Sequence, residues 1–474
     1  AQTGVLGKFK FSTEKEALQL IIYVEAYQLK NVYVQLKDFV NLKVTLETFS
    51  QNLSEIQIKA RTAKVFELKR LGDVEGTSIF AGKKTEVVLV NQSAANLAAN
   101  NARQIFNQIA GLNIFQNDDA GLQLNIGGRG LNPNRTANFN TRQNGYDISA
   151  DVLGYPESYY TPASEGLDEI QIVRGAASLQ YGTQFGGLIN FITKKPSTKP
   201  LEIITRNTVG SFGLFTNFTS FSGTSGKFSY YSYINYKKGN GFRPNSNFDS
   251  KNIFTHLEYK LNEKDVFSLE ITYLDYLAQQ AGGLTDRTFK DAPLQSNRAR
   301  NWFKVDWLLY NFKWEHAFSN QTNFSLNIFG LDASRKAVGF RERRVDLADN
   351  GGARELLIGD FNNYGFEARI LTKYTIFGKK ATYLVGTKFY KADNTDFQGP
   401  GSDAENANFS SALAQFPDYR VQGNFRNPNT NIALFGENIF YVSDKISITP
   451  GARFEYIKTA SKGVGKITNT DSAG

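Results

Sequence analysis

Apolar and polar residues alternate strictly along several segments in the second half of the chain. In "DVFSLEITYL" (residues 265–274), every odd-numbered position from Phe267 to Tyr273 is apolar and the positions between them are polar. "ISITPGARFEY" (446–456) repeats the pattern, and "NFSLNIFGL" (323–331) follows it more loosely. A period of two predicts β-strands with one apolar face. We therefore expect antiparallel strands from about residue 200 onward, although this alternation fits any half-buried antiparallel sheet.

The connections between these strands fall into two length classes. Those near "NEKD", "SNQT", "FGKK" and "SDK" are tight, whereas those at about 277–301, 333–360 and 391–428 are long and rich in charge, Gly and Asn. Short turns on one edge and long loops on the other, with strands of about ten residues, are typical of outer-membrane barrels. A water-soluble sandwich does not need such regularity. Aromatic residues near strand ends suit an interfacial girdle; they are Tyr273, Tyr276, Phe454 and Tyr456.

The first 200 residues have a different character. Residues 1–52 predict a small β-rich unit with strands at "VYVQLKDFV" (32–40) and "LKVTLETF" (42–49), followed by a charged connector. Residues from about 75 to 198 mix helical and strand patterns. The clearest helix is expected at "NNARQIFNQIAG" (100–111), where three apolar residues share one face and Gly111 stands at the C-cap position.

Composition narrows the class of protein. The 474 residues include 38 Phe and 23 Tyr but only 3 Trp, and the mean hydropathy is −0.38. The longest apolar run, at 18–29, is broken and too short for a membrane helix, whereas barrel strands carry only weak signals. Cys is absent, which removes disulfides and thiolate chemistry. His256 and His316 each stand alone in strand-like segments, where a satisfied or solvated histidine is more common than a ligand or base.

The net charge and the two ends of the sequence give further expectations. The net charge of +9 is spread along the chain without a basic helical face or a nucleic-acid-binding motif, so we expect no nucleic-acid partner. The start "AQT" is typical of a mature end left after removal of a signal peptide. Because Met is absent and the end "NTDSAG" is no aromatic terminal strand, we expect that residues are missing from this sequence.

A glycine-rich centre separates two apolar runs between Glu169 and Lys195. Its spacing is not G-x-G-x-x-G and no G-K-[ST] follows, which argues against a phosphate-binding loop. Glycine within a strand pattern marks a bulge, a tight turn or a close approach of another backbone. A tight hairpin in an ordinary sheet is the simpler alternative.

Several motifs in a fixed order give the chain a family resemblance. They are "NIGGRGLNPNR" (125–135), "NGYD" (144–147), "GYPESYYTP" (154–162), "DEIQIVRGAASLQYG" (168–182) and "GGLINFITKK" (186–195). In this order they resemble the plug domain of TonB-dependent outer-membrane transporters, most closely the ferric dicitrate receptor type of Bacteroidota. The residues that carry the plug motifs are Arg129, Gly130, Arg174, Gly175, Tyr181, Gly182, Gly186 and Gly187.

This resemblance implies an all-β transmembrane β-barrel with an α/β plug domain in its lumen and a small β-rich N-terminal extension. We expect 22 strands in the complete protein and about half of them in this chain. An open half-barrel would expose unpaired backbone edges to lipid, so the remaining strands are expected in the missing part. A barrel that wide must be plugged. The expected parts are a carboxypeptidase-regulatory-like extension (1–52), a TonB box with linker (53–74), the plug (75–198) and the first part of the barrel (199–474).

The resemblance also implies a place and partners. The protein is expected in the bacterial outer membrane with its N-terminus in the periplasm, in contact with lipid and lipopolysaccharide and with a possible surface lipoprotein. A TonB–ExbB–ExbD complex is expected to capture the TonB box as an edge strand. That box is "LSEIQIKA", comprising Leu53, Ser54, Glu55, Ile56, Gln57, Ile58, Lys59 and Ala60.

The leading functional hypothesis is active import of a ferric chelate, ferric citrate or a similar anionic siderophore, with iron only in the cargo and no resident cofactor or metal. An anionic chelate needs convergent cations, and arginine suits carboxylates. "SRKAVGFRERR" supplies Arg335, Lys336, Arg341, Arg343 and Arg344. Alignment with the ferric dicitrate family favours Arg335, Arg354 and Arg426 on the barrel, with Asn140 and Gln184 on the plug apex.

Alternatives remain open. The basic loop also fits a solvated surface or one that binds lipopolysaccharide phosphates. SusC-like uptake of an oligosaccharide or peptide is disfavoured by Arg174-Gly175, where that pattern has Lys-Asp. A barrel adhesin without transport is a further alternative. An enzyme is not expected, because no nucleophile, base and orienting group stand together in the sequence.

Overall fold

The computed structural model describes most of the chain from residue 69 onward and parts of the N-terminal region. The described residues are 8, 16–22, 30–35, 42–46, 69–93, 95–99, 101, 103–106, 109–116, 118, 120–122, 124–128, 130, 139–155, 157–174, 178–182, 186–342, 344–443 and 445–467. Two compact units, Ala1–Thr62 and Ala63–Gly474, divide the chain. The predicted TonB box (53–60) lies outside the described residues.

The first unit contains a β-hairpin. Strand β1 (Ala17–Ile22) pairs antiparallel with β2 (Lys30–Gln35). The strand predicted at 42–49 does not form over its described part, because residues 42–46 pair with no other strand. Alternating polarity shows that a segment can be extended, but it does not identify a partner strand.

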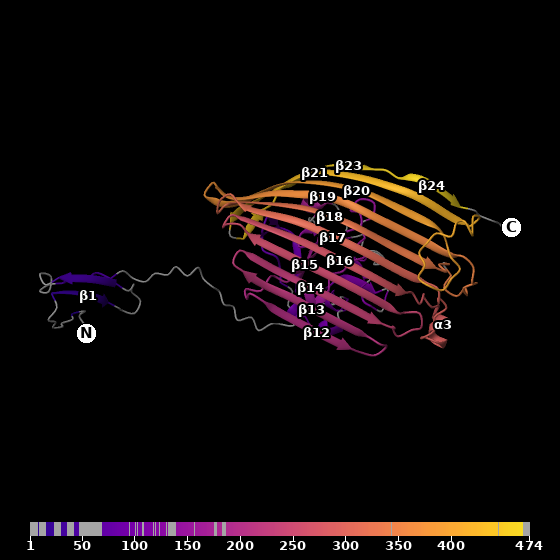
Figure 1. The fold of residues 1–474 in the computed structure, drawn as a ribbon. Coiled ribbons are helices and arrows are strands. Elements are labelled where there is room, and N and C mark those ends of the chain that lie inside the picture. The colour runs from indigo at the N-terminus through magenta and orange to yellow at the C-terminus, as the bar shows by residue number, and fades with distance from the viewer. Residues whose placement is uncertain are drawn as a thin grey trace. The chain divides into compact units, whose positions relative to one another are not determined.

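A large antiparallel meander makes up most of the second unit (Figure 1). Consecutive strands are neighbours from β12 to β21, and β22, β23 and β24 follow one another along β21, so they share an eleventh strand position. About eleven strands were expected. Their bounds are β12 Glu202–Val209, β13 Phe215–Ser225, β14 Phe228–Gly239, β15 Phe248–Lys260, β16 Asp265–Gln279, β17 Trp302–Ala317, β18 Thr322–Gly339, β19 Arg354–Ile376, β20 Lys379–Gly401, β21 Val421–Ser443, β22 Ile446–Ile448, β23 Gly451–Thr459 and β24 Lys462–Ile467.

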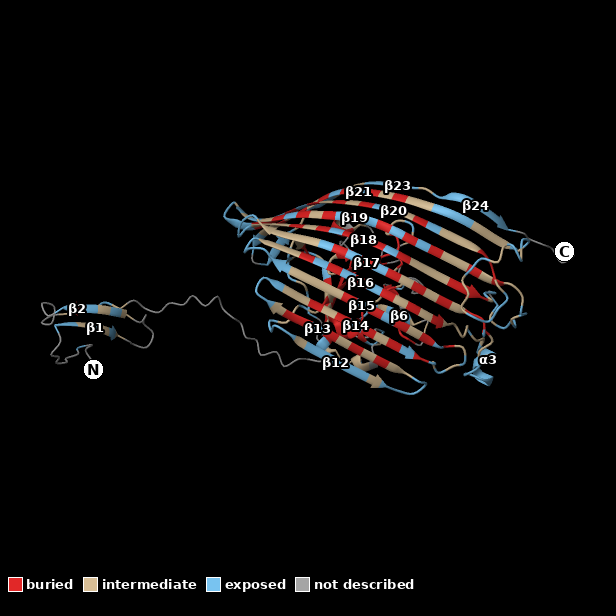
Figure 2. Ribbon diagram, in the orientation of Figure 1, coloured by how far each residue is buried: buried red, intermediate tan, exposed pale blue. Residues whose placement is uncertain are grey.

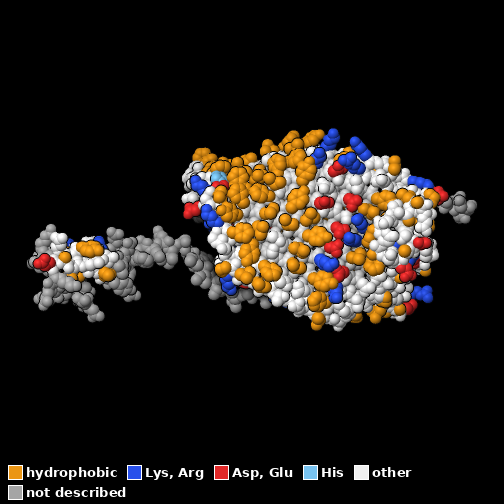
Figure 3. All heavy atoms as spheres, viewed as in Figure 1, with side chains coloured by type: hydrophobic (Ala, Val, Ile, Leu, Met, Phe, Trp, Pro, Cys, Tyr) orange, Lys and Arg blue, Asp and Glu red, His pale blue; other side chains and the backbone are white. Residues whose placement is uncertain are grey.

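The two faces of this sheet have the reverse polarity of a water-soluble sheet. In β16 the polar side chain of Glu270 is buried, whereas Leu269 and Ile271 are 39% and 43% exposed. Figure 3 shows the outward apolar side chains as a band that ends at a belt of charged residues. The band includes Leu269, Ile271, Tyr273, Leu308, Tyr310, Phe312, Ile328, Phe366, Ile370, Val385, Ile432 and Leu434. An apolar exterior around a polar interior is the arrangement of a barrel that crosses lipid.

The belt marks where the sheet leaves the apolar layer. Lys251, Asp275 and Asp306 lie directly opposite one another on three neighbouring strands. The predicted girdle residue Tyr273 faces outward, but Tyr276 is 1% exposed and faces inward. Residues three apart in a strand point to opposite faces, so only one of these two tyrosines can reach the membrane interface.

The long loops are shorter than expected because the strands continue past the belt. The predicted loop 333–360 is reduced to 340–353 between β18 and β19, and 391–428 to 402–420 between β20 and β21. Backbone ladders continue over most of the added strand ends. Charged and Gly-rich strand ends are therefore compatible with pairing once they stand in water beyond the apolar band. The loop 280–301 carries α3 (Asp286–Asp291).

The rest of the second unit is a mixed α/β domain. Its central sheet has the order β5-β10-β11-β8-β9, in which only β11 and β8 run parallel. Its strands are β3 Val74–Glu75, β4 Ser78–Ile79, β5 Lys84–Leu89, β6 Leu112–Gln116, β7 Leu124–Gly128, β8 Phe139–Gln143, β9 Tyr146–Asp147, β10 Leu167–Arg174 and β11 Gly187–Thr193. Its helices are η2 Val90–Gln92, η3 Leu97–Ala99, α1 Arg103–Phe106, η5 Ser164–Gly166 and α2 Ser178–Tyr181.

The helix predicted at 100–111 is much shorter in the structure. It is α1, and the side chain of Asn101 accepts the N–H of Arg103 at its start. Gly111 adopts a positive φ of 72°, and β6 follows at Leu112. The apolar face was predicted correctly, since Ile105, Phe106 and Ile109 are buried. Capping by Asn101 starts the helix at Arg103, later than predicted.

The glycine-rich stretch forms a hairpin whose strands β10 and β11 are antiparallel neighbours with α2 between them. Gly187 has φ of 108°, and a Cβ there would lie 2.2 Å from the Val173 carbonyl oxygen. Only glycine tolerates that approach. The close approach of another backbone, one of the alternatives that the sequence left open, therefore occurs, whereas the connection between the two strands contains α2 and is not a tight turn.

One hydrophobic core joins the α/β domain to the inner wall of the sheet. Ile172, Ile189 and Phe106 of the domain share a cluster with Trp307 and Phe329 of the sheet. Buried residues accordingly run along the inner sides of the strands in Figure 2. The prediction of a barrel sheet with an α/β domain in its lumen is confirmed. Among the described residues, no helix is long and apolar enough to cross a membrane.

The reversed polarity of the sheet predicts a position-dependent response to charge. Ile271→Lys, in the outward apolar band, should destabilise the folded protein in bilayers by about 2–4 kcal/mol. Gln279→Lys, outward on the same strand beyond the belt, is the matched control and should cost little. Denaturant titration in lipid vesicles measures both. Equal effects of the two substitutions would contradict the assignment of the band to lipid.

Candidate functional site

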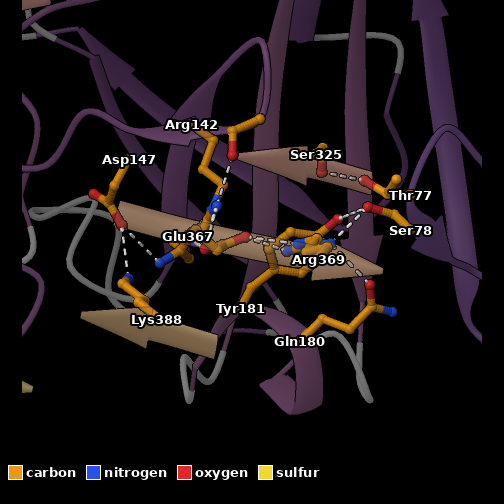
Figure 4. Close-up of polar contacts among 12 residues, drawn as sticks. Thr77, Ser78, Arg142, Asp147, Gln180, Tyr181, Ser325, Glu367, Arg369 and Lys388 are labelled. Atoms are coloured by element: carbon orange, nitrogen blue, oxygen red, sulfur yellow. Dashed lines mark hydrogen bonds and ion pairs between the residues drawn. The ribbon is translucent and has the colours of Figure 1, made fainter. Parts of the chain in front are cut away.

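A buried ionic cluster connects the lumen domain to the barrel wall (Figure 4). At its centre Glu367 of β19 accepts hydrogen bonds from Arg142 of β8, at 3.2 Å, and from Arg369 of its own strand. Lys388 of β20 lies opposite Glu367 in the ladder, 3.8 Å from Asp147 of β9. These side chains are at most 5% exposed. The cluster therefore couples two strands of the wall to the β8–β9 hairpin.

Strand periodicity explains why these charges meet. Glu367 and Arg369 are two residues apart on β19, so both point inward, and the register places Lys388 beside them. Burial of one charge alone would be very unfavourable, whereas a hydrogen-bonded set of opposite charges is tolerated. The arrangement fixes the depth and rotation of the lumen domain, because the partners of Arg142 and Arg369 come from both the domain and the wall.

Helix α2 carries a second set of contacts to the same cluster. The ring of Tyr181 lies between the guanidinium groups of Arg142 and Arg369, each 4.7 Å from its centroid. Gln180 is fully buried; its side-chain carbonyl accepts from Arg369 at 3.1 Å, and its amide donates to Glu437 of β21. Two short stretches of the lumen domain thus converge on neighbouring residues of β19, β8 on Glu367 and α2 on Arg369.

The segment Asp73–Lys83, which we call the strap, is attached directly to the wall. Ser78 accepts a hydrogen bond from Arg369 at 2.7 Å, and Thr77 bonds to Ser325 at 2.6 Å. Asp73 accepts from Tyr441 at 2.9 Å, and Lys83 pairs with Glu437 at 2.7 Å. The strap also binds α2, since the amide of Gln180 donates to the Ile79 carbonyl. It is therefore the N-terminal member of the ionic cluster.

A separate aromatic floor lies toward the long-loop end. Tyr155 stacks on Phe361 with ring centroids 5.3 Å apart, and Tyr159 contacts Trp307 edge-on at 6.1 Å. The guanidinium of Arg335 lies 5.9 Å and 5.7 Å from the centroids of Tyr155 and Tyr159 and donates to the Tyr155 hydroxyl at 3.2 Å. The floor thus combines π-faces with one cation.

The tyrosines of the floor remain neutral at physiological pH. Burial raises the pKa of both Tyr155 and Tyr159, and the nearby positive charge of Arg335 only partly opposes it. Their hydroxyl groups bond to each other, and Tyr159 also donates to Glu157 at 3.0 Å. Arg335 is consequently the group on this floor that supplies positive charge to a ligand.

The predicted barrel arginines do not converge. Arg335 faces the lumen, but Arg354 is fully buried and donates to the backbone carbonyls of Ser402, Arg300 and Asn406. Arg354 thereby holds loops together. Arg426 lies on the outward face, where it pairs with Asp393. Adjacent positions of a strand face opposite sides, and loop alignment could not reveal this.

The other predicted ligand residues are also dispersed. Asn140 is buried in the ionic cluster, where it accepts from Arg142 at 2.8 Å. In the basic run, Lys336 points to the outer face and Arg344 pairs with Asp346. Gln184 and Arg343 lie outside the described residues. Arg341 lies 3.8 Å from Glu355.

The described glycines of the plug motifs act mainly through their backbone conformation. Gly130 and Gly182 have positive φ values of 75° and 93°, and Gly186 is buried. Arg174 pairs with Glu86 of β5 at 2.9 Å. Arg129 and Gly175 lie outside the described residues.

Sequence reasoning did not identify the ionic cluster. Glu367, Arg369 and Lys388 occupy the polar positions of alternating strands, which predicts an inward face but no partner. Arg142 lies in β8, which shows no alternation at all. Partners come from strands more than 200 residues apart, as for Arg142 and Glu367. Among the residues that the structure describes, no group of three or more Asp, Glu or His side chains could hold a metal ion.

The ionic cluster predicts a large cost for removing its central anion. Glu367→Gln leaves the buried Arg142 and Arg369 without a compensating charge and should destabilise the protein by about 3–5 kcal/mol. Glu315→Gln removes the anion of an exposed pair with Lys313 and should cost about 0–1 kcal/mol. Thermal unfolding of both variants measures the difference. A Glu367 variant no less stable than the Glu315 control would show that the cluster does not hold the lumen domain.

Two family models match the chain. The one described as TonB-dependent Receptor Plug Domain matches residues 83–188, and the one described as TonB dependent receptor-like, beta-barrel matches residues 260–473. They correspond to the lumen domain and to most of the barrel sheet.

Solved structures with the same fold support this assignment. The ferric citrate transporter FecA in its unliganded form is 20% identical, with a TM-score of 0.66 over 81% of this chain and 58% of that chain. The ferripyoverdine receptor of the outer membrane of Pseudomonas aeruginosa is 14% identical, with a TM-score of 0.64 over 82% and 54%. The ferric yersiniabactin uptake receptor FyuA from Yersinia pestis is 12% identical, with a TM-score of 0.60 over 81% and 61%.

At these identities the likeness establishes the fold, and the chain spans somewhat over half the length of each of these structures. The family models, the reversed polarity of the sheet and the domain in its lumen agree with one another. The chain belongs to the TonB-dependent receptors, outer-membrane proteins in which a plug domain lies inside a β-barrel.

Proposed function

We propose that this protein imports an anionic ferric chelate, ferric citrate or a similar siderophore, across the outer membrane. The observation that carries the proposal is the position of Arg335 on the lumen-facing floor beside Tyr155 and Tyr159. The similar structures include a ferric citrate transporter and a ferripyoverdine receptor, which supports ferric chelates as the cargo class. Iron would enter only as part of the cargo, without a resident cofactor.

Arg335 has a hydrogen-bond donor available for such a cargo. Its Nε is buried and has no hydrogen-bond partner among the described residues, while the guanidinium lies against two aromatic rings. A guanidinium binds carboxylate or phenolate oxygens through charge-assisted hydrogen bonds. The floor offers one such cation rather than three, so stacking on Tyr155 and Tyr159 would contribute more to binding than the sequence suggested.

Energy coupling would act through the strap. The predicted TonB box, residues 53–60, precedes the strap by a short linker, and a TonB–ExbB–ExbD complex would pair with it as an added strand on the periplasmic side. A pulling force on the box would act first on the hydrogen bonds between the strap and the wall. The strap residues in these bonds are Asp73, Thr77 and Ser78. Release of Ser78 would remove one partner from Arg369, which would loosen the ionic cluster that holds the plug.

The position of Arg335 predicts a specific loss of binding. Arg335→Ala should weaken binding of ferric citrate by about 1.5–3 kcal/mol, the range for a hydrogen bond to a charged group, and binding should fall as salt rises. Arg426→Ala is the matched control, because Arg426 faces outward. Calorimetry with the purified full-length protein measures both. Unchanged affinity in the Arg335 variant would contradict the anionic-chelate proposal, as would binding of a neutral oligosaccharide instead.

The coupling proposal separates transport from binding. Deleting residues 53–60 should abolish iron uptake but leave chelate binding intact, because the aromatic floor lies in a different part of the protein. A variant with the same eight residues in scrambled order controls for linker length and should also be inactive in uptake. Uptake assays on whole cells, with binding measured in parallel, distinguish the two steps. Uptake that persists without the box would refute the assignment.

A further inference from the structure

A second cation-lined site lies at the tight-turn end of the barrel wall. A groove of about 870 Å³ there lies between the strap and the ends of β19, β20 and β21. Asp73 and Tyr441 line it together with Lys373, Lys379 and Lys380. Within the described part of the chain, these three lysines have no side-chain hydrogen bond or ion pair. The groove is therefore positively charged and unoccupied by protein side-chain partners.

Strand register separates the lysines into two sets. Thr375 lies opposite Lys380 in the ladder, and Lys373 is two residues before Thr375, so Lys373 and Lys380 point to the inner face. They share this face with Arg369, which stands four residues before Lys373. Lys379 lies next to Lys380 in sequence and therefore points to the opposite face.

The two inward lysines continue a column of cations along the inner wall. From the long-loop end to the tight-turn end of β18, β19 and β20, the column comprises Arg335, Lys388, Arg369, Lys373 and Lys380. Arg335 belongs to the floor and the next two to the ionic cluster. The column thus begins where a chelate would bind and ends in the groove.

We propose that the inner face of β18–β20 is the path along which the anionic chelate crosses the lumen, and that the groove with Lys373 and Lys380 is its exit site. This inference rests on the proposed function, because it takes the same anionic cargo. The column also contains Glu367, so its charges are mixed within the ionic cluster. The groove at its end has three lysines against Asp73, and this excess positive charge concentrates an anion there.

The resting contacts explain why the path is closed. Arg369 is bonded to Glu367, Ser78 and Gln180, and Lys388 is held near Asp147, so the middle of the column has no free donors for cargo. The strap borders the groove through Asp73. Displacement of the strap would release donors of Arg369 and join the groove to the lumen in one movement. Cargo therefore has a continuous route only after energy coupling.

The experiment compares charge removal inside the groove with charge removal at another tight turn. Cells that express the full-length protein are supplied with radioactive iron as ferric citrate. K373Q/K380Q should lower the initial rate of iron uptake by roughly tenfold, equivalent to about 1.4 kcal/mol in barrier height. K264Q, in the turn between β15 and β16 and outside the groove, should leave the rate unchanged. All three lysines are exposed, so both variants should fold, and calorimetric binding of ferric citrate at the floor should be the same in both.

The outcomes discriminate the exit site from the proposed function. Equal uptake by K373Q/K380Q and K264Q overturns the exit site while leaving ferric-chelate import in place. A wild-type protein that neither binds nor imports ferric citrate overturns the proposed function, and the anionic path with it. Loss of binding in K373Q/K380Q also overturns the inference, because the groove would then act on the floor and not on exit.

Discussion

Every strand of this barrel must present apolar side chains to lipid, and this constraint leaves the inner face free to be polar. Within the apolar band, period two then places polar residues such as Glu270 of β16 and Glu367 of β19 toward the lumen. The polar and charged groups that line a wide lumen need hydrogen-bonding or ionic partners, because a buried charge without a partner is unfavourable. The plug domain supplies those partners. Its fit is therefore determined as much by ion pairs and hydrogen bonds as by apolar packing.

The ionic cluster around Glu367 meets this requirement with a small number of groups. Arg142 from β8, Gln180 and Tyr181 from α2, and Ser78 from the strap all contact Glu367 or Arg369. A cooperative set of this kind is stable while complete and weak once one member leaves. Such a property suits a plug that must stay in place at rest and yield when its N-terminal segment is displaced.

The distribution of charge along the wall relates binding to passage. Arg335 lies at one end of the inner face and Lys373 near the other, with Arg369 between them held by plug residues. Under the proposed function, this wall would bind an anion at the floor, exclude it while the plug is seated and lead it to the groove afterwards. Most barrel arginines outside this column serve other purposes. Arg354, for example, ties loop carbonyls together.

Sequence alone determined the class of fold, because alternation with period two and the rhythm of short and long connections are local properties. It also located the plug motifs and the glycines, such as Gly187, whose backbone conformation excludes a side chain. Tertiary structure decided which residues meet. Arg426 and Arg335 look equivalent in sequence, but register puts them on opposite faces of the sheet. Likewise, Arg142 and Glu367 are 225 residues apart, and only closure of the wall around the plug brings them together.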